Sequence, residues 1–273
     1  MLLQPTLDKL HQLKLIAMAE AVREQQALPA MADLTFEERL GLLVDREWEA
    51  RENRGLTRRL RDAHFKLAAC VEDIDFRADR GLDKSVILRL MECRFIPEHH
   101  HVLITGPTGV GKTYLACALG QRACRRHHRV GYYRCEQLLL AMRQARLDGS
   151  YPALLSRLEK MDLLILDDWG VTPYDQAAAR DLFEVVDDRT TRGALIITSQ
   201  APSTTWYELI TAPQLADAIL DRVVHNSYKL EVRGESMRKR RGQTWTSTAE
   251  APTPPAPTQS HEAGGRHADP TTI

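Results

Sequence analysis

Glycines, a lysine and a threonine gather in one short stretch of the chain, with a spacing that suits phosphate binding. The stretch runs Gly106-Pro-Thr-Gly-Val-Gly111-Lys112-Thr113, so four residues separate the first glycine from Gly111. Glycine lets backbone N–H groups approach an anion closely, and a helix that starts near Gly111 would direct further N–H groups at the same anion. Lys112 would reach the β- and γ-phosphates of a nucleotide, and Thr113 would offer its hydroxyl to Mg²⁺.

The residues on either side of this loop support the interpretation. Residues 102–104 form a short apolar run typical of a buried strand, and residues 114–124 are rich in alanine and leucine, as in a buried helix. A strand, a glycine-rich loop and a helix in this order indicate a nucleotide site rather than an isolated turn. The predicted ATP-binding residues are Gly106, Pro107, Thr108, Gly109, Val110, Gly111, Lys112, Thr113 and Tyr114.

Two adjacent aspartates end a second apolar run. The run covers residues 161–166 and leads directly into Asp167 and Asp168. An aspartate at the end of such a strand completes the Mg²⁺ shell, usually through water, so we assign Asp167 to the metal together with Thr113. Asp168 is then placed to orient and deprotonate the attacking water.

Two weaker patterns follow. A third apolar run, residues 194–198, ends in Ser199 and Gln200, either of which could hydrogen-bond the γ-phosphate or the lytic water; simple strand termination explains them equally well. Arg222 follows Asp221 at the end of an apolar helix. Its guanidinium could neutralise the γ-phosphate of a neighbouring subunit, or it could form a surface ion pair, and nothing local separates the two.

Strands and helices alternate from residue 102 onwards, which predicts an α/β fold with a parallel sheet covered by helices on both faces. Ligands of such sheets bind at the carboxyl ends of the strands, where the glycine-rich loop is expected. We predict strands at 102–105, 129–134, 162–167 and 194–199, an extended piece at 228–233, and helices at 112–126, 136–147, 153–160, 177–191, 203–210 and 213–225.

The first part of the chain is helical and highly charged. Leucines and Ala17 recur at helical spacing until Leu28-Pro29, and Thr35 with Glu38 forms a capping box for a second helix. That helix has an apolar stripe, Phe36, Leu40, Leu43, Val44 and Trp48. It continues into basic residues that either form a solvated surface or contact a phosphate backbone; they are Arg51, Arg54, Arg58, Arg59, Arg61 and Lys66.

Composition narrows the class of protein. The 273 residues have zero formal net charge and an apolar share of 43%, which is ordinary for a soluble globular protein. There is no membrane-length apolar run, no signal-peptide pattern and no CxxC pair among five cysteines, so we expect a cytoplasmic protein with reduced thiols. His99, His100 and His101 suit a solvated turn better than a metal site.

Changes in composition suggest four segments. We expect a helical N-terminal domain at 1–66, a linker with one helix at 67–95, an ATPase domain at 96–242 and a disordered tail at 243–273.

The order of these motifs resembles the AAA+ ATPases of the DnaC/IstB group. The phosphate loop, the Leu-Asp-Asp strand, the Ile-Thr-Ser-Gln strand, the Leu-Asp-Arg helix and the stretch Gly234-Glu-Ser-Met-Arg238 follow one another as in that group. The similarity spans about residues 5 to 241. The stretches that resemble the IstB members of the group in particular are Leu13-Lys14-Leu15, Met18-Ala19-Glu20-Ala21 and residues 34–40, 106–118, 163–170, 215–226 and 234–238.

The resemblance implies an ATPase that helps an insertion sequence to transpose. It implies assembly of a homo-oligomer on double-stranded DNA in the ATP state, bending of that target, and delivery to a DDE transposase of the same element. Ser199 or Gln200 would be the first sensor, Arg222 the arginine finger supplied in trans, and Arg238 a second sensor-like arginine. Asp168 replaces the glutamate of most AAA+ ATPases, and the chain after Arg222 is short for the usual helical lid, which weakens the case for Arg238. Basic residues of the ATPase core are further candidates for DNA contact: Arg122, Arg125, Arg126, Arg129, Arg134, Lys229, Arg233, Arg238, Lys239, Arg240 and Arg241.

Three alternatives stay open. A DnaC-like helicase loader would share the ATPase core but bind single-stranded DNA and a helicase. A P-loop kinase of a small metabolite would need an acceptor pocket and a lid, and neither is visible in the sequence. A non-hydrolysing interaction module conflicts with the intact Lys112, Thr113, Asp167 and Asp168.

Overall fold

The computed structural model describes residues 3–76 and 80–237. Contacts group the chain up to Met237 into one compact unit. Arg238 and the tail at 243–273 lie outside the described residues, so the predictions for them stay predictions.

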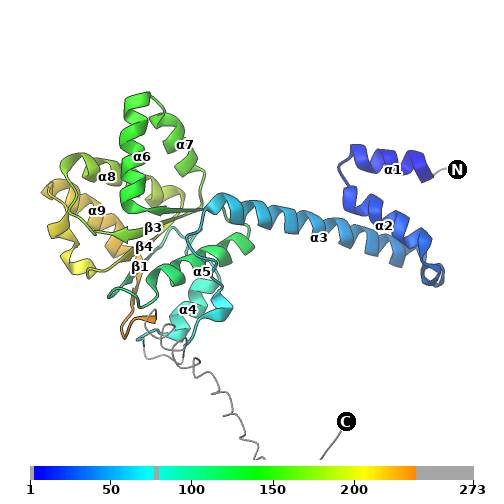
Figure 1. Cartoon of the computed structure of the whole chain (residues 1–273), viewed down its shortest axis with the longest axis horizontal. Helices are drawn as coiled ribbons and strands as arrows, with labels where there is room; N and C mark the ends of the chain where they lie inside the picture. Colours follow the sequence, from blue (N-terminus) through cyan, green and yellow to red (C-terminus); the bar gives the residue numbers. More distant parts are fainter. Residues whose placement is uncertain (1–2, 77–79, 238–273) are drawn as a thin grey trace, which may run out of the picture. The chain divides into compact units, whose positions relative to one another are not determined.

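The centre of the fold is a five-stranded sheet in which every pair of neighbouring strands is parallel (Figure 1). The strand order is β2-β3-β4-β1-β5, so β1 lies between β4 and β5. The strands are β1 His101–Thr105, β2 Val130–Arg134, β3 Leu163–Trp169, β4 Ala194–Ser199 and β5 Ser227–Glu231. The predicted α/β class is confirmed, and the extended piece expected near the end of the chain is β5.

Helices cover both faces of the sheet because successive strand residues point to opposite sides (Figure 1). Leu163 and Ile165 belong to a core with α4 (Lys84–Met91) and α5 (Lys112–Arg125). Leu164 and Leu166 belong to a second core with the remaining helices: α6 Cys135–Asp148, α7 Tyr151–Glu159, α8 Gln176–Arg192 and α9 Pro213–His225. Short 3₁₀ helices lie at η1 Pro29–Asp33, η2 Val71–Asp73 and η3 Ser203–Leu209, the last where we expected an α-helix.

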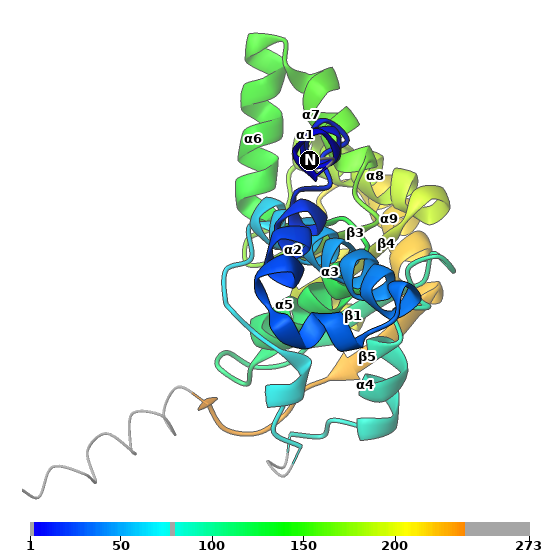
Figure 2. The same ribbon diagram turned by 90° about the vertical axis from the view of Figure 1, so that its right-hand side faces the viewer.

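Three helices precede the sheet: α1 Leu3–Gln12, α2 Ile16–Ala27 and α3 Phe36–Ala63. The sequence predicted one helix before Leu28, but the chain forms two, α1 and α2, because it turns at Lys14, whose φ is 60°. The capping box is confirmed: the Thr35 hydroxyl accepts from the Glu38 N–H at 3.3 Å, and the Thr35 N–H donates to the Glu38 carboxylate at 2.8 Å. α2 packs along α3 (Figure 2).

Four of the five residues in the apolar stripe of α3 face solvent, and the fifth, Leu43, is half-buried. Phe36 is 73% exposed and Trp48 is 66% exposed, and Leu40 and Val44 are exposed as well. In this part of the helix the buried side chain is instead Glu47, which accepts from Arg51 at 2.8 Å, from Arg54 at 3.1 Å and from the Met18 N–H of α2 at 3.2 Å. The buried residues of α2 are three alanines, at 17, 19 and 21, and Gln25, whose Nε2 donates to the Arg39 carbonyl of α3 at 3.0 Å. Contact between the two helices therefore depends on small residues, one amide and one buried carboxylate.

The end of α3 packs against the sheet and α5. Ala63 is fully buried there, and Arg59 Nε donates to the Cys124 carbonyl of α5 at 2.8 Å. The residues just after α3 therefore lie beside the sheet and α5.

His101 corrects one of our expectations. It is not part of a solvated turn: it begins β1, is completely buried, and its Nδ1 accepts from the Leu195 N–H at 3.2 Å. Burial, with smaller effects of nearby cations, lowers its pKa to about 4. No group of three metal-ligating side chains occurs in the part of the chain that the structure describes. Within that same part, no helix has the length and apolarity that crossing a membrane requires.

Candidate active site

The glycine-rich loop connects β1 to α5, and two of its glycines have no room for a side chain. Gly106 has a φ of 145°, and a Cβ added to it would lie 2.0 Å from the Val232 carbonyl oxygen. Gly109 has a φ of 88°, and its Cβ would lie 2.2 Å from Ser236 Oγ. Left-handed backbone and close neighbours both require glycine here. The loop is therefore shaped by the segment after β5 as well as by β1.

Lys112 is the first residue of α5, and its side chain folds back over the loop. Nζ donates to the carbonyl oxygens of Gly106 at 2.7 Å and Pro107 at 2.8 Å, and the residue is only 8% exposed. Burial lowers the pKa of this ammonium, against the opposing effect of Asp168 and Asp167. A buried cation at a helix N-terminus favours an anionic ligand, as the spacing predicted.

Asp167 is fully buried at the end of β3 and accepts hydrogen bonds from three hydroxyl groups. Thr113 Oγ1 lies 2.9 and 3.1 Å from its two carboxylate oxygens, and Thr198 and Tyr132 donate to one oxygen each. Burial and the bond to Asp167 raise the pKa of Tyr132. The predicted pair Thr113 and Asp167 is thus in contact, and both supply the oxygen ligands that Mg²⁺ prefers.

Asp168 has a φ of 61°, which is uncommon for a residue other than glycine and concentrates at functional sites. The register of β3 against β4 shifts between Leu166 and Trp169, so Asp168 leaves the regular pairing of the strand. Its carboxylate is partly exposed and lies 3.2 Å from Arg134 Nη2 and 3.7 Å from Lys66 Nζ. A carboxylate held at the open edge of the sheet is placed where a general base is needed.

Ser199 and Gln200 lie in different surroundings. The Ser199 hydroxyl is buried, donates to the Trp169 carbonyl at 2.8 Å and accepts from the Ala201 N–H at 3.2 Å. Gln200 Oε1 accepts from the Thr108 hydroxyl at 2.8 Å, so it contacts the phosphate loop directly. Between the two sensor candidates, Gln200 is the one next to the phosphate position.

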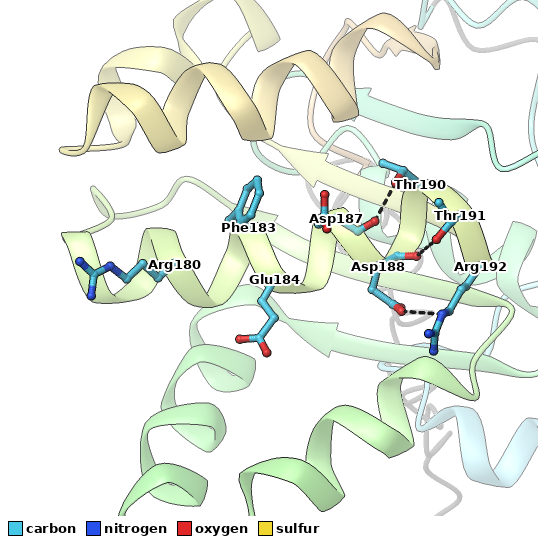
Figure 3. A pocket seen from close by; sticks show the side chains of 8 residues that line it. All are labelled: Arg180, Phe183, Glu184, Asp187, Asp188, Thr190, Thr191 and Arg192. Atoms are coloured by element: carbon cyan, nitrogen blue, oxygen red, sulfur yellow. Dashed lines mark hydrogen bonds and ion pairs between the residues drawn. The ribbon is translucent and has the colours of Figure 1, made fainter.

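Arg222 lies on α9 and contacts α8. Its Nε donates to Asp187 at 2.8 Å, and its guanidinium lies 4.9 Å from the centre of the Phe183 ring. Both partners line an open groove of about 560 Å³ along α8, with Arg180, Glu184, Asp188, Thr190, Thr191 and Arg192 (Figure 3). No lining residue belongs to the predicted nucleotide site, and in the described residues no hydrogen bond or ion pair joins Arg222 to the phosphate loop. The structure does not bring Arg222 together with the other site residues of its own chain.

The last described residues return to the phosphate loop. The Met237 N–H donates to the Gly109 carbonyl at 2.9 Å, and Ser236 packs on the same glycine. Arg238 follows directly but lies outside the described residues.

Several side chains at the site escaped the sequence analysis. Thr198 and Tyr132 orient Asp167, and Lys66, which we had grouped with the basic residues that follow the apolar stripe, lies 3.5 Å from the same carboxylate. Arg134 was grouped with a basic surface run, yet it pairs with Asp168. Only the position of Thr198, next to two residues that we did select, could have drawn attention to it.

Comparison with known proteins agrees with this geometry. The sequence matches the family described as IstB-like ATP binding protein over residues 8–244. The chain belongs to this family. It is 45% identical over 239 residues to an insertion sequence ATP-binding protein of Sinorhizobium fredii, covering 88% of this chain and 98% of that protein. It is 47% identical over 215 residues to the ATP-binding protein of insertion sequence IS1162 from Pseudomonas fluorescens, covering 78% and 93%.

Solved structures support the fold of this IstB-like chain. The DnaC helicase loader matches with a TM-score of 0.50 at 17% identity, over 64% of this chain and 99% of that one. AMPPCP-bound DnaA from Aquifex aeolicus matches with a TM-score of 0.54 at 19% identity, over 68% and 57%. The chain is therefore an IstB-like ATP-binding protein whose fold is similar to those of DnaC and DnaA.

Proposed function

We propose that this chain is an ATP-dependent helper of insertion-sequence transposition, which assembles as a homo-oligomer on target duplex DNA, remodels it and stimulates a DDE transposase of the same element. The observation that carries the proposal is the extent of the family match. It begins at residue 8, within α1, and includes all of α2 and α3, and relatives that cover 88% and 78% of this chain are insertion sequence ATP-binding proteins. Similarity in the part outside the ATPase core favours transposition over helicase loading.

Each residue of the nucleotide site has its own role. Lys112 and the loop N–H groups bind the phosphates, while Thr113 and Asp167 would hold Mg²⁺, which would neutralise phosphate charge. Asp168 accepts the proton of the attacking water. Gln200 contacts the γ-phosphate side of the loop, and Arg222 acts on the nucleotide of a neighbouring subunit after leaving Asp187.

The basic residues of α3 form the preferred DNA surface. Among the basic residues of the core, Arg125 pairs with Glu72, Arg122 donates to the Met91 carbonyl and Arg134 pairs with Asp168, so these three are used inside the fold. On α3, Arg51 and Arg54 share the single carboxylate of Glu47 and stay half exposed. Such residues keep positive charge to offer to phosphates.

The first experiment measures binding to duplex and single-stranded DNA with ATP, with ADP and without nucleotide, for the wild type and Lys112→Ala. We expect ATP-dependent duplex binding that the variant loses. Affinity should fall steeply between about 50 and 200 mM salt, as phosphate contacts require. A preference for single strands would instead support helicase loading, and no DNA binding in any state would remove the proposal.

A further inference from the structure

Arg80 is a buried arginine beside the phosphate loop that the function described so far does not use. It is 6% exposed, and its Nε is buried without a hydrogen-bond partner in the described part of the chain. Nη2 donates to the carbonyl of Asp75. No ion pair of Arg80 with a carboxylate occurs among residues 3–76 and 80–237. Because a guanidinium without a counter-charge is costly to bury, an anion bound beside Arg80 would stabilise it.

The guanidinium lies against the start of α5. A Cβ added to Gly111 would lie 3.3 Å from Arg80 Nη1, and Gly111 is the residue that precedes the helix. The positive end of the helix and the Lys112 ammonium are therefore close to a third positive group. Each of them is stabilised by the same anion, a phosphate in the loop.

The backbone of Arg80 identifies which phosphate. Its carbonyl accepts from the Arg233 N–H at 2.8 Å, directly after β5. A Cβ on the next residue, Gly81, would lie 3.5 Å from the Glu231 carbonyl of β5. Asp167 and Asp168 end β3, on the other side of β1 in the strand order. Arg80 thus approaches the loop from the side opposite to the γ-phosphate chemistry.

We propose that Arg80 is a phosphate ligand that binds the α- or β-phosphate, the part that ATP and ADP share. The proposal rests on the nucleotide site described above and adds to it a binding residue from the segment before α4. Because the guanidinium is held in place before any nucleotide binds, it increases affinity for both nucleotides and does not distinguish them.

The test compares Arg80→Met with the wild type in direct calorimetric titrations with ADP and with ATP. A charge-assisted contact to phosphate contributes about 1.5–3 kcal/mol, so both affinities should fall by a similar factor, on the order of 10- to 100-fold. Thermal melting without nucleotide should give an unchanged or higher Tm for the variant, because the methionine stem fills the same space without the uncompensated charge. The rise in Tm that ADP gives the wild type should be largely lost.

Two further variants separate the alternatives. Arg80→Lys retains a cation and should bind both nucleotides with intermediate affinity, and it remains informative if Arg80→Met folds poorly. Arg89→Met, an exposed arginine on α4, should bind as the wild type does. A lower Tm with unchanged affinities would make Arg80 purely structural, and loss of ATP but not ADP affinity would overturn the assignment to the shared phosphates. A wild type that binds no nucleotide would instead remove the proposed function itself.

Discussion

Three hydroxyl groups hold Asp167, and they come from different elements: Thr113 from α5, Tyr132 from β2 and Thr198 from β4. None of them carries a charge, so they orient the carboxylate without neutralising it, and its charged neighbour is the Lys66 ammonium at 3.5 Å. Thr198 has a second task, because its Oγ1 accepts from the Asp168 N–H at 3.1 Å. One side chain thus positions both aspartates.

Thr198→Val should slow ATP hydrolysis about 10- to 100-fold, because losing a hydrogen bond to a buried carboxylate costs about 1.5–3 kcal/mol. Nucleotide affinity should change little, since the phosphate loop is untouched. Ser199→Ala is the matched control: its hydroxyl binds the Trp169 carbonyl, so it should lose roughly 1 kcal/mol of stability but keep its turnover. Steady-state hydrolysis and ADP titration measure both variants. Equal loss of turnover in the two would contradict the role of Thr198.

His101 should make the fold sensitive to mild acid. Its pKa falls from 6.5 to about 4 in the folded chain, so between these values the unfolded chain binds a proton that the folded chain does not. The free energy of unfolding from this group is complete above pH 6.5 and decreases by up to about 1.4 kcal/mol per pH unit on acidification. His101→Gln keeps an acceptor for the Leu195 N–H and should show a shallower decrease in urea unfolding between pH 7 and 5. Parallel curves for the two proteins would exclude this residue as the cause.

Sequence patterns predicted those residues of the candidate site that lie close together in the chain. The loop from Gly106 to Thr113 and the pair Asp167 and Asp168 are contiguous, so their spacing is visible in the chain. Thr198 and Tyr132 act on a carboxylate more than thirty residues away in sequence. Nothing in their neighbours reveals that contact, which only the packing of β2, β3 and β4 creates.

At the scale of elements, the sequence predicted where α3 begins but not which of its faces packs against α2. The capping box fixes the first turn locally, whereas the face that α3 presents to α2 contains Glu47 and not the apolar stripe. An apolar stripe normally indicates the buried face. A prediction that the apolar stripe is buried would fail here. Alanines on α2 allow the two helices to approach closely, and a carboxylate of α3 accepts from the α2 backbone.

Glu47→Ala should loosen α2 from α3 without unfolding the ATPase core. The variant removes the acceptor for the Met18 N–H and leaves Arg51 and Arg54 unpaired, at a cost of about 1–3 kcal/mol. Hydrogen exchange should accelerate in residues 16–27 and stay unchanged in β1 and β4. Glu49→Ala, an exposed neighbour on the same helix, should leave both regions as they are. Unchanged exchange in α2 would show that alanine packing alone joins the helices.

At the scale of the whole molecule, alternation of strands and helices predicted a parallel sheet but not its order. The central place of β1 arises because β4 and β5, both far along the chain, pair on either side of it. Apolar runs of similar length do not specify which strands become neighbours. The order follows from the crossovers that let α5 cover one face and α6, α7, α8 and α9 cover the other.

Removing residues 243–273 should leave the melting temperature and the ATPase rate unchanged. Among the described residues the last buried apolar side chain is Val232, and the compact unit ends at Met237. A second truncation after residue 232 provides the contrast, since it deletes Ser236 and Met237, which contact Gly109. That shorter chain should bind nucleotide more weakly in the same titrations. Equal binding by both truncated chains would show that the contacts at Gly109 do not matter.

The position of β5 also has a consequence for biosynthesis. β1 leaves the ribosome early, but Thr105 finds its hydrogen-bond partner at Val232, and Gly106 packs on the same residue. The strand that carries the phosphate loop therefore has an unpaired edge until nearly the whole chain has been translated. A nascent chain should acquire nucleotide binding late and abruptly, when residues near 232 emerge from the exit tunnel, and until then the exposed edge of β1 makes the growing chain a client for chaperones.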